Sequence, residues 1–128
     1  MISIVIPVYN ERDNVKLLYE KIQDTMQKMG ESFEVIFVDD GSTDDTVKIL
    51  KTLKGIIVLV LSMDFGQTLA LDAGIQEAKG EIIITMDGDL QNDPVDIPKL
   101  VAKIHEGYDV VSGWRQNRDD SSSRRILS

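Results

Sequence analysis

The sequence of 128 residues predicts an α/β fold, a Rossmann-like, mainly parallel sheet with helices on both faces. Five short runs rich in Ile and Val recur along the chain, and they are continuous apolar runs more than alternating ones, which is typical of strands covered on both faces. Segments with helical spacing of apolar residues separate these runs. This alternation favours parallel strands that are connected by crossover helices.

The strands are expected at residues 2–7, 33–38, 56–61, 81–86 and 109–112. Between the first two, an apolar stripe from Val15 to Met29 indicates a helix, and Gly30 follows as a favourable C-terminal cap. A second helix is expected from Thr43 to about Leu53, because acidic residues in its first turn suit the helix dipole.

The third helix is expected at residues 67–78, before the fourth strand. The fourth begins with Asp93 as the N-cap and Pro94 at the first helical position, and it ends at Gly107. The chain then enters the fifth predicted strand. Residues 115–128 predict a loop, so we divide the chain into a domain at residues 1–114 and a basic loop at residues 115–128.

Composition excludes several classes of site and partner. The chain has no cysteine and one histidine, so disulfides, thiolate zinc sites, cysteine nucleophiles and histidine-rich metal centres are ruled out. The net charge of −8 argues against binding to nucleic acid, which requires a basic face. The longest apolar stretch, at residues 56–61, is far shorter than the ~18 residues of a membrane span. We therefore expect the 128-residue chain itself to be soluble and cytoplasmic.

Polar residues follow four successive predicted strands, at the edge where ligands bind in open α/β sheets. Five aspartates are expected to converge there: Asp39, Asp40, Asp64, Asp87 and Asp89. Grouped carboxylates repel one another unless a cation compensates them, and Mg²⁺ and Mn²⁺ prefer oxygen ligands. Such a cation commonly bridges to a nucleotide diphosphate. Asp and Gly are also ordinary turn formers, an explanation that fits residues 87–89 alone better than four strand ends together.

Four segments carry a resemblance to a known family: residues 6–11 (IPVYNE), 38–44 (VDDGSTD), 65–67 (FGQ) and 87–94 (DGDLQNDP). In this order they resemble glycosyltransferase family 2, of GT-A fold. The last segment, with the downstream residues 112–118 (SGWRQNR), is most similar to the polyprenyl-phosphate glycosyltransferases. That group includes dolichyl-phosphate mannose synthases. The resemblance covers the whole chain, but family members are longer, which implies that residues 115–128 lead to an absent acceptor-binding half.

The resemblance implies roles for particular residues. The residues expected to contact the nucleotide are Pro7, Tyr9, Glu11, Val38, Asp39, Asp40, Asp87, Gly88 and Asp89. Asp89 and Gln91 would ligate Mg²⁺ or Mn²⁺, with Asp87 as an alternative ligand. Arg115, Arg124 and Ser128 would face the acceptor or donor phosphate, and the catalytic set would be Asp87, Asp89 and Arg115. Two positions depart from the family pattern, Gly88, where Ala is commoner, and Asp64, where Asn is frequent.

The activity implied is an inverting, metal-dependent transfer of a hexose from a UDP-sugar or GDP-sugar to undecaprenyl or dolichyl phosphate. The full-length enzyme would act at the cytoplasmic face of a membrane, held there by its C-terminal part. One alternative is a family 2 transferase that acts on a sugar hydroxyl of a polysaccharide or glycolipid. A remote alternative is a receiver-type signalling domain, but in receivers the acidic pair follows the first strand, whereas here it follows the second.

Overall fold

A computed structural model of the chain describes residues 1–62, 66–107, 110–111 and 125–127. In chain order, the first elements are β1 (Ile2–Val8), α1 (Val15–Met29), β2 (Phe33–Asp39), α2 (Thr46–Leu50) and β3 (Ile57–Val60). The remaining elements are α3 (Gln67–Glu77), β4 (Ile82–Thr85), the 3₁₀ turn η1 (Pro94–Asp96), α4 (Ile97–His105), β5 (Val110–Val111) and β6 (Arg125–Leu127).

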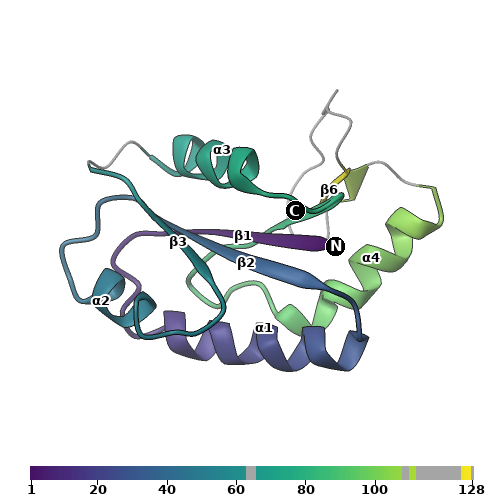
Figure 1. Cartoon of the computed structure of the whole chain (residues 1–128), viewed down its shortest axis with the longest axis horizontal. Helices are drawn as coiled ribbons and strands as arrows, with labels where there is room; N and C mark the ends of the chain where they lie inside the picture. The colour runs from purple at the N-terminus through teal and green to yellow at the C-terminus, as the bar shows by residue number, and fades with distance from the viewer. Residues whose placement is uncertain (63–65, 108–109, 112–124, 128) are drawn as a thin grey trace.

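The strands form one six-stranded sheet in the order β3-β2-β1-β4-β6-β5. Every pair of neighbouring strands runs parallel. Helix α3 covers one face of the sheet, whereas α1, α2 and α4 lie on the other (Figure 1). The α/β class and the mainly parallel sheet predicted from the sequence are therefore confirmed.

Strand β1 lies at the centre of the sheet, and its side chains supply both layers of the core. Ile4 and Ile6 pack in the cluster with α1 and α4, whereas Val5 packs in the smaller cluster under α3. All seven residues of β1 are buried. This explains why the strand is apolar on both faces except for Ser3, whose Oγ donates to Glu34 and accepts from the Gly80 N–H.

The cap predictions at two helices are confirmed. Gly30 follows α1 with a φ of 71°, and its N–H donates to the carbonyls of Met26 and Gln27. The Asp93 carboxylate accepts a hydrogen bond from the Val95 N–H at 3.1 Å. The fourth predicted helix is divided, however, because the turn η1 precedes α4.

Helix α2 begins later than the sequence predicts, because the backbone before it bonds to side chains, and it ends at Leu50 instead of near Leu53. The N–H groups of Thr43 and Asp44 donate to Oδ1 of Asn10, at 2.8 and 3.3 Å. The Thr46 N–H donates to Oδ1 of Asp44 at 2.9 Å. These bonds hold residues 43–45 in a loop, and the helix begins at Thr46.

The assignment of residues 115–128 to a loop was wrong for its last part, because residues Arg125–Leu127 form β6. This strand pairs with β4 on one side and with β5 on the other. Its sequence is too short to show a strand pattern, so pairing with two neighbours decides its conformation. Within the residues that the structure describes, no helix is long and apolar enough to cross a membrane.

Candidate nucleotide-sugar site

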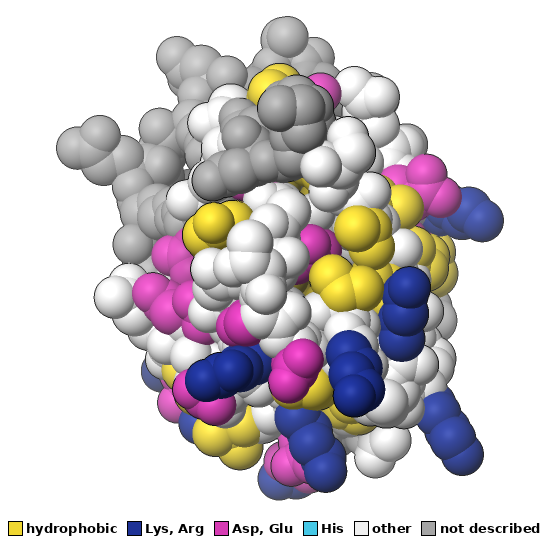
Figure 2. Space-filling view, turned by 90° about the vertical axis from the view of Figure 1, so that its left-hand side faces the viewer, with side chains coloured by type: hydrophobic (Ala, Val, Ile, Leu, Met, Phe, Trp, Pro, Cys, Tyr) yellow, Lys and Arg dark blue, Asp and Glu magenta, His cyan; other side chains and the backbone are white. Residues whose placement is uncertain are grey.

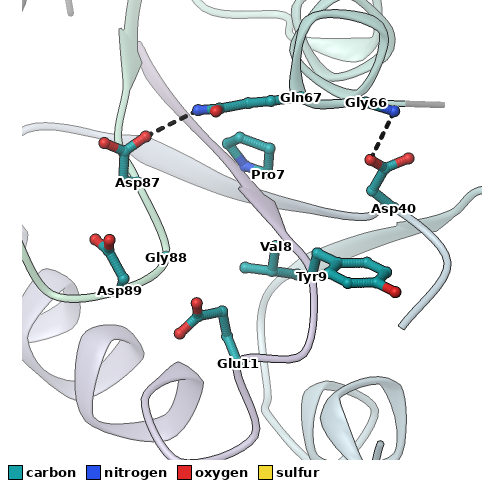
Figure 3. A pocket seen from close by; sticks show the side chains of 10 residues that line it. All are labelled: Pro7, Val8, Tyr9, Glu11, Asp40, Gly66, Gln67, Asp87, Gly88 and Asp89. Carbon is teal, nitrogen blue, oxygen red and sulfur yellow. Dashed lines mark hydrogen bonds between the residues drawn. The ribbon is translucent and has the colours of Figure 1, made fainter. Parts of the chain in front are cut away.

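A pocket of about 370 Å³ opens at the carboxyl edge of the sheet. The loops after β1, β2 and β4 and the first turn of α3 form its walls (Figure 3). Its lining residues are Pro7, Val8, Tyr9, Glu11, Asp40, Gly66, Gln67, Asp87, Gly88 and Asp89. The place is the one expected for a ligand in an open parallel sheet.

The loop after β1 is tied to the loop after β2 through Asn10. This residue has a left-handed φ of 52°, and its N–H donates to Oγ of Ser42 at 2.8 Å. The Glu11 N–H donates to Oγ1 of Thr46 at 2.9 Å. These contacts fix the two pocket residues that flank Asn10. Tyr9 remains 44% exposed, and the Glu11 carboxylate accepts a hydrogen bond from Nδ2 of Asn14 at 2.7 Å.

The two adjacent aspartates after β2 differ in what they contact. Asp39 is 1% exposed, and its Oδ2 accepts hydrogen bonds from the N–H groups of Gly41 and Ser42, so it shapes the turn. Asp40 lines the pocket, and its Oδ2 accepts a hydrogen bond from the Gly66 N–H at 2.9 Å. Of the pair, only Asp40 presents its carboxylate to a ligand in the pocket.

The loop after β4 presents Asp87 and Asp89 on the same side of the pocket (Figure 3). The buried Asn92 accepts a hydrogen bond from the Asp87 N–H at 2.8 Å, and Asp89 accepts one from the Gln91 N–H at 3.2 Å. Gly88 lies so close to the end of β1 that an added Cβ would meet Cγ1 of Val8 at 2.7 Å. The glycine therefore lets the acidic loop pack against β1.

The pocket is strongly acidic. Four of its lining residues are Asp or Glu, and none of those that the structure describes there is Lys, Arg or His. Figure 2 faces this edge and shows acidic side chains gathered on it, with most Lys and Arg side chains in the lower half of the view. Such a wall attracts cations and repels a bare diphosphate, so a counterion would strengthen the binding of an anionic ligand there.

The donor set fits a cation that the protein shares with its ligand. Among the described residues, no group of three or more His, Cys, Asp or Glu side chains could hold a metal ion by itself. Asp87 and Asp89 offer two carboxylates facing an open pocket. Mg²⁺ is usually held in this way, by one or two carboxylates together with waters and substrate phosphates.

The structure brings together most of the predicted nucleotide contacts: Pro7, Tyr9, Glu11, Asp40, Asp87, Gly88 and Asp89. Two others do not line the pocket: Val38 is buried in the core beside α3, and Asp39 is buried in its turn. Gln91, which was predicted as a metal ligand, is exposed next to the acidic loop and does not line the pocket either. The predictions for Asp64, Arg115, Arg124 and Ser128 concern residues outside the described ones.

Sequence reasoning gave no role to three lining residues, Val8, Gly66 and Gln67. Gly66 and Gln67 belong to the Phe-Gly-Gln motif, which carried part of the family resemblance. The available signal was their position: they follow a predicted strand and precede a predicted helix, at the same edge as the aspartates.

Comparisons with known proteins agree with this geometry. Two curated relatives are undecaprenyl-phosphate 4-deoxy-4-formamido-L-arabinose transferases. The one from Pseudomonas savastanoi pv. phaseolicola is 43% identical over 129 residues, covering 97% of this chain and 38% of the relative. The one from Proteus mirabilis is 42% identical over 132 residues, covering 99% of this chain and 40% of the relative. The chain thus spans about two fifths of these relatives' length.

Solved structures show the same fold. A mannosyltransferase from Pyrobaculum calidifontis, in complex with GDP-Man and Mn²⁺, has a TM-score of 0.73 at 22% identity, over 90% of this chain and 35% of that one. TarS from S. aureus, in complex with UDP-GlcNAc, has a TM-score of 0.70 at 23% identity, over 92% of this chain and 37% of that one. The model of glycosyl transferase family 2 matches residues 3–128, and the chain belongs to this family.

Proposed function

We propose that this chain binds the nucleotide-sugar donor in an inverting, metal-dependent transferase that moves a hexose to undecaprenyl or dolichyl phosphate. The observation that carries the proposal is the division of the pocket into two chemically different ends. Tyr9 and Asp40 lie at one end, and Asp87 and Asp89 lie at the other (Figure 3).

The Tyr9–Asp40 end suits a nucleoside. The Tyr9 ring is 44% exposed, so it offers an aromatic surface against which a base can stack. The Asp40 carboxylate is an acceptor for ribose hydroxyls or base N–H groups. Its bond to the Gly66 N–H holds it at the pocket wall.

The Asp87–Asp89 end suits the diphosphate together with its cation. Asp87 and Asp89 would hold Mg²⁺ or Mn²⁺, and Gln91 follows them closely in the same loop. When bound, the cation neutralises the charge that develops on the leaving diphosphate. Gly88, which lets this loop lie against β1, lines the pocket between the two acids.

The acceptor we propose is a lipid phosphate, and it is supported by the names of the two relatives, which act on undecaprenyl phosphate. A phosphate oxygen is already ionised, so attack on the sugar carbon from the face opposite the diphosphate needs no general base. Arg115, Arg124 and Ser128 are proposed to face that phosphate at the cytoplasmic side of a membrane.

The sugar requires a separate test, because the relatives are named for a substituted arabinose, which is a pentose, whereas we propose a hexose. Transfer by the whole protein is to be measured with UDP-linked and GDP-linked hexoses and with the formamido-arabinose donor. The acceptors are a short polyprenyl phosphate and a free oligosaccharide. Transfer to the oligosaccharide alone would favour the alternative, a transferase that acts on sugar hydroxyls.

Donor binding can be tested on the chain itself by calorimetric titration of UDP and GDP, with Mn²⁺ or with EDTA. We expect Mn²⁺ to strengthen binding of one nucleotide at least roughly tenfold, and Asp89→Ala to remove that gain. Asp24→Ala is the control, because Asp24 is an exposed carboxylate on α1 that pairs with Lys28, away from the pocket. Equal affinities in Mn²⁺ and EDTA for the unaltered chain would refute the metal-dependent site.

A further inference from the structure

The first turn of α3 provides hydrogen-bond donors to carboxylates at both ends of the pocket. The Gly66 N–H donates to Oδ2 of Asp40 at 2.9 Å, and Nε2 of Gln67 donates to Oδ1 of Asp87 at 2.9 Å (Figure 3). Asp40 and Asp87 come from loops after different strands. A single short segment thus touches both ends of the proposed nucleotide site.

Both donors are electrically neutral, and this matters in an acidic pocket. A Lys or Arg beside Asp87 would compensate its charge and compete with a metal ion, whereas an amide N–H orients the carboxylate and leaves the charge in place. The described lining residues include no basic side chain. These two donors therefore hold the Asp40 and Asp87 carboxylates in position without themselves adding positive charge to the pocket.

Gln67 is well supported for such a task, because it is the first residue of a helix fixed to the sheet. Gly66 precedes it with a φ of 94°, a conformation that favours glycine. Ala70, Leu71 and Gly74 of α3 are buried against the sheet. The backbone at Gln67 is thereby anchored to the sheet, and from there the side-chain amide reaches Asp87.

We propose that Gln67 is a positioning residue that orients the Asp87 carboxylate for ligation of the divalent cation of a nucleotide diphosphate. The inference rests on the proposed function, since that function supplies the cation. Groups that hydrogen-bond to metal ligands fix their orientation, and their loss typically lowers metal affinity by roughly 10- to 100-fold. Because Gln67 is exposed, we expect the lower end of that range.

The test is calorimetric titration of Mn²⁺, alone and in the presence of UDP or GDP. The variants are Gln67→Met, which keeps the length of the side chain without its donor, and Gln67→Ala. Gln76→Met is a matched control, because Gln76 lies on the same helix and its Nε2 donates to Oδ2 of Asp72 at 3.0 Å, between exposed side chains. We expect both Gln67 variants to bind Mn²⁺ roughly tenfold more weakly, and Gln76→Met to bind it normally.

Two further measurements separate positioning from a general structural role. The thermal midpoint of the Gln67 variants should equal that of the unaltered chain, and so should their affinity for UDP and GDP in EDTA. If the start of α3 had moved, the contact of Gly66 with Asp40 would be lost as well, and the metal-free affinity would fall in parallel. A parallel fall would overturn the proposal.

The outcomes also distinguish this inference from the proposed function. Unchanged Mn²⁺ affinity in both Gln67 variants would overturn the role of Gln67 and leave the metal-dependent donor site intact. No Mn²⁺ binding by the unaltered chain, with or without nucleotide, would refute the metal-dependent site and the role of Gln67 together.

Discussion

Gly74 determines how closely α3 can lie on the sheet, and Gly74→Ala tests this directly. An added Cβ would lie 2.3 Å from Cγ1 of Val5 and 3.0 Å from Cγ2 of Val38. Carbon atoms in favourable contact are about 3.5–4.0 Å apart, so the new methyl group would overlap Val5 by more than about 1 Å. Val5 and Val38 are both completely buried and β-branched, so neither can turn aside easily.

Two opposing effects set the size of the change. Overpacking a core typically costs about 1–3 kcal/mol of unfolding free energy. Replacing glycine by alanine inside a helix returns about 0.5–1 kcal/mol through higher helix propensity. Because the overlap is severe and its partner is a stiff side chain in the central strand, we expect overpacking to dominate. The net loss should be about 1–2 kcal/mol.

Urea unfolding of four chains measures this loss and identifies its cause. They are the unaltered chain, Gly74→Ala, Val5→Ala and the double variant. Val5→Ala removes the methyl group that the new Cβ would meet, so Gly74→Ala should cost almost nothing in that background. The coupling between the two sites should reach about 1–2 kcal/mol. Thr68→Ala, at an exposed position of α3, is a control for helix propensity and should cause no loss.

A Gly74→Ala chain as stable as the unaltered one would refute the argument, and so would a loss that is equal with and without the Val5→Ala substitution. A second readout connects packing to the site. Gly66 and Gln67 lie at the start of helix α3. A chain in which this helix is pushed away from the sheet should therefore also bind Mn²⁺ more weakly. The Val5→Ala substitution should restore that affinity in part.

Two further predictions concern the loops beside the pocket. Asn10→Ala should lower the free energy of unfolding by about 1–3 kcal/mol in urea titrations. The substitution removes the acceptor for the Thr43 N–H and places alanine at a φ of 52°. Unchanged stability would contradict this role of Asn10. Burial opposes ionisation of Asp44, but hydrogen bonds from Thr46 and the charge of Arg12 together lower the pKa of Asp44 below its ordinary 3.8. Asp44 therefore stabilises the fold above pH 3.8, and this contribution is lost as the pH falls through its lower folded pKa. Asp44→Asn should reduce the loss of stability as the pH falls below 3.8 in thermal melts, and an identical acid transition in both chains would contradict the assignment.

Much of the fold could be predicted because its central elements carry strong local signals. Strand β1 is apolar at every position except Ser3, since both of its faces are buried. Helix α1 shows a clear stripe from Val15 to Met26, and Gly30 ends it with the left-handed conformation that glycine adopts readily. These features depend on neighbouring residues alone, so they can be inferred without knowing the tertiary contacts.

Other features depend on partners that are distant in sequence. Residues Arg125–Leu127 become a strand because β4 and β5 pair with them on both sides. The start of α2 is set by Asn10, more than thirty residues earlier. The role of Gln67 becomes visible only when its amide is placed beside Asp87, twenty residues later. Local pattern carries no information about such contacts.

Asp39 is buried and Asp40 lines the pocket because of the register between β1 and β2, which local sequence pattern does not reveal. In the ladder of β1 with β2, Val8 pairs with Asp39, so Tyr9 and Asp40 are the next residues on each strand. Successive side chains in a strand point to opposite faces, and a slip of one residue would turn Asp39 to the face on which Asp40 now lies. The observed register buries Asp39 in its turn and brings Asp40 to the pocket that Tyr9 also lines. The pairing of two central strands therefore decides which carboxylate a nucleoside could contact, and Asp40→Asn should weaken nucleotide binding without Asp39 being able to replace it.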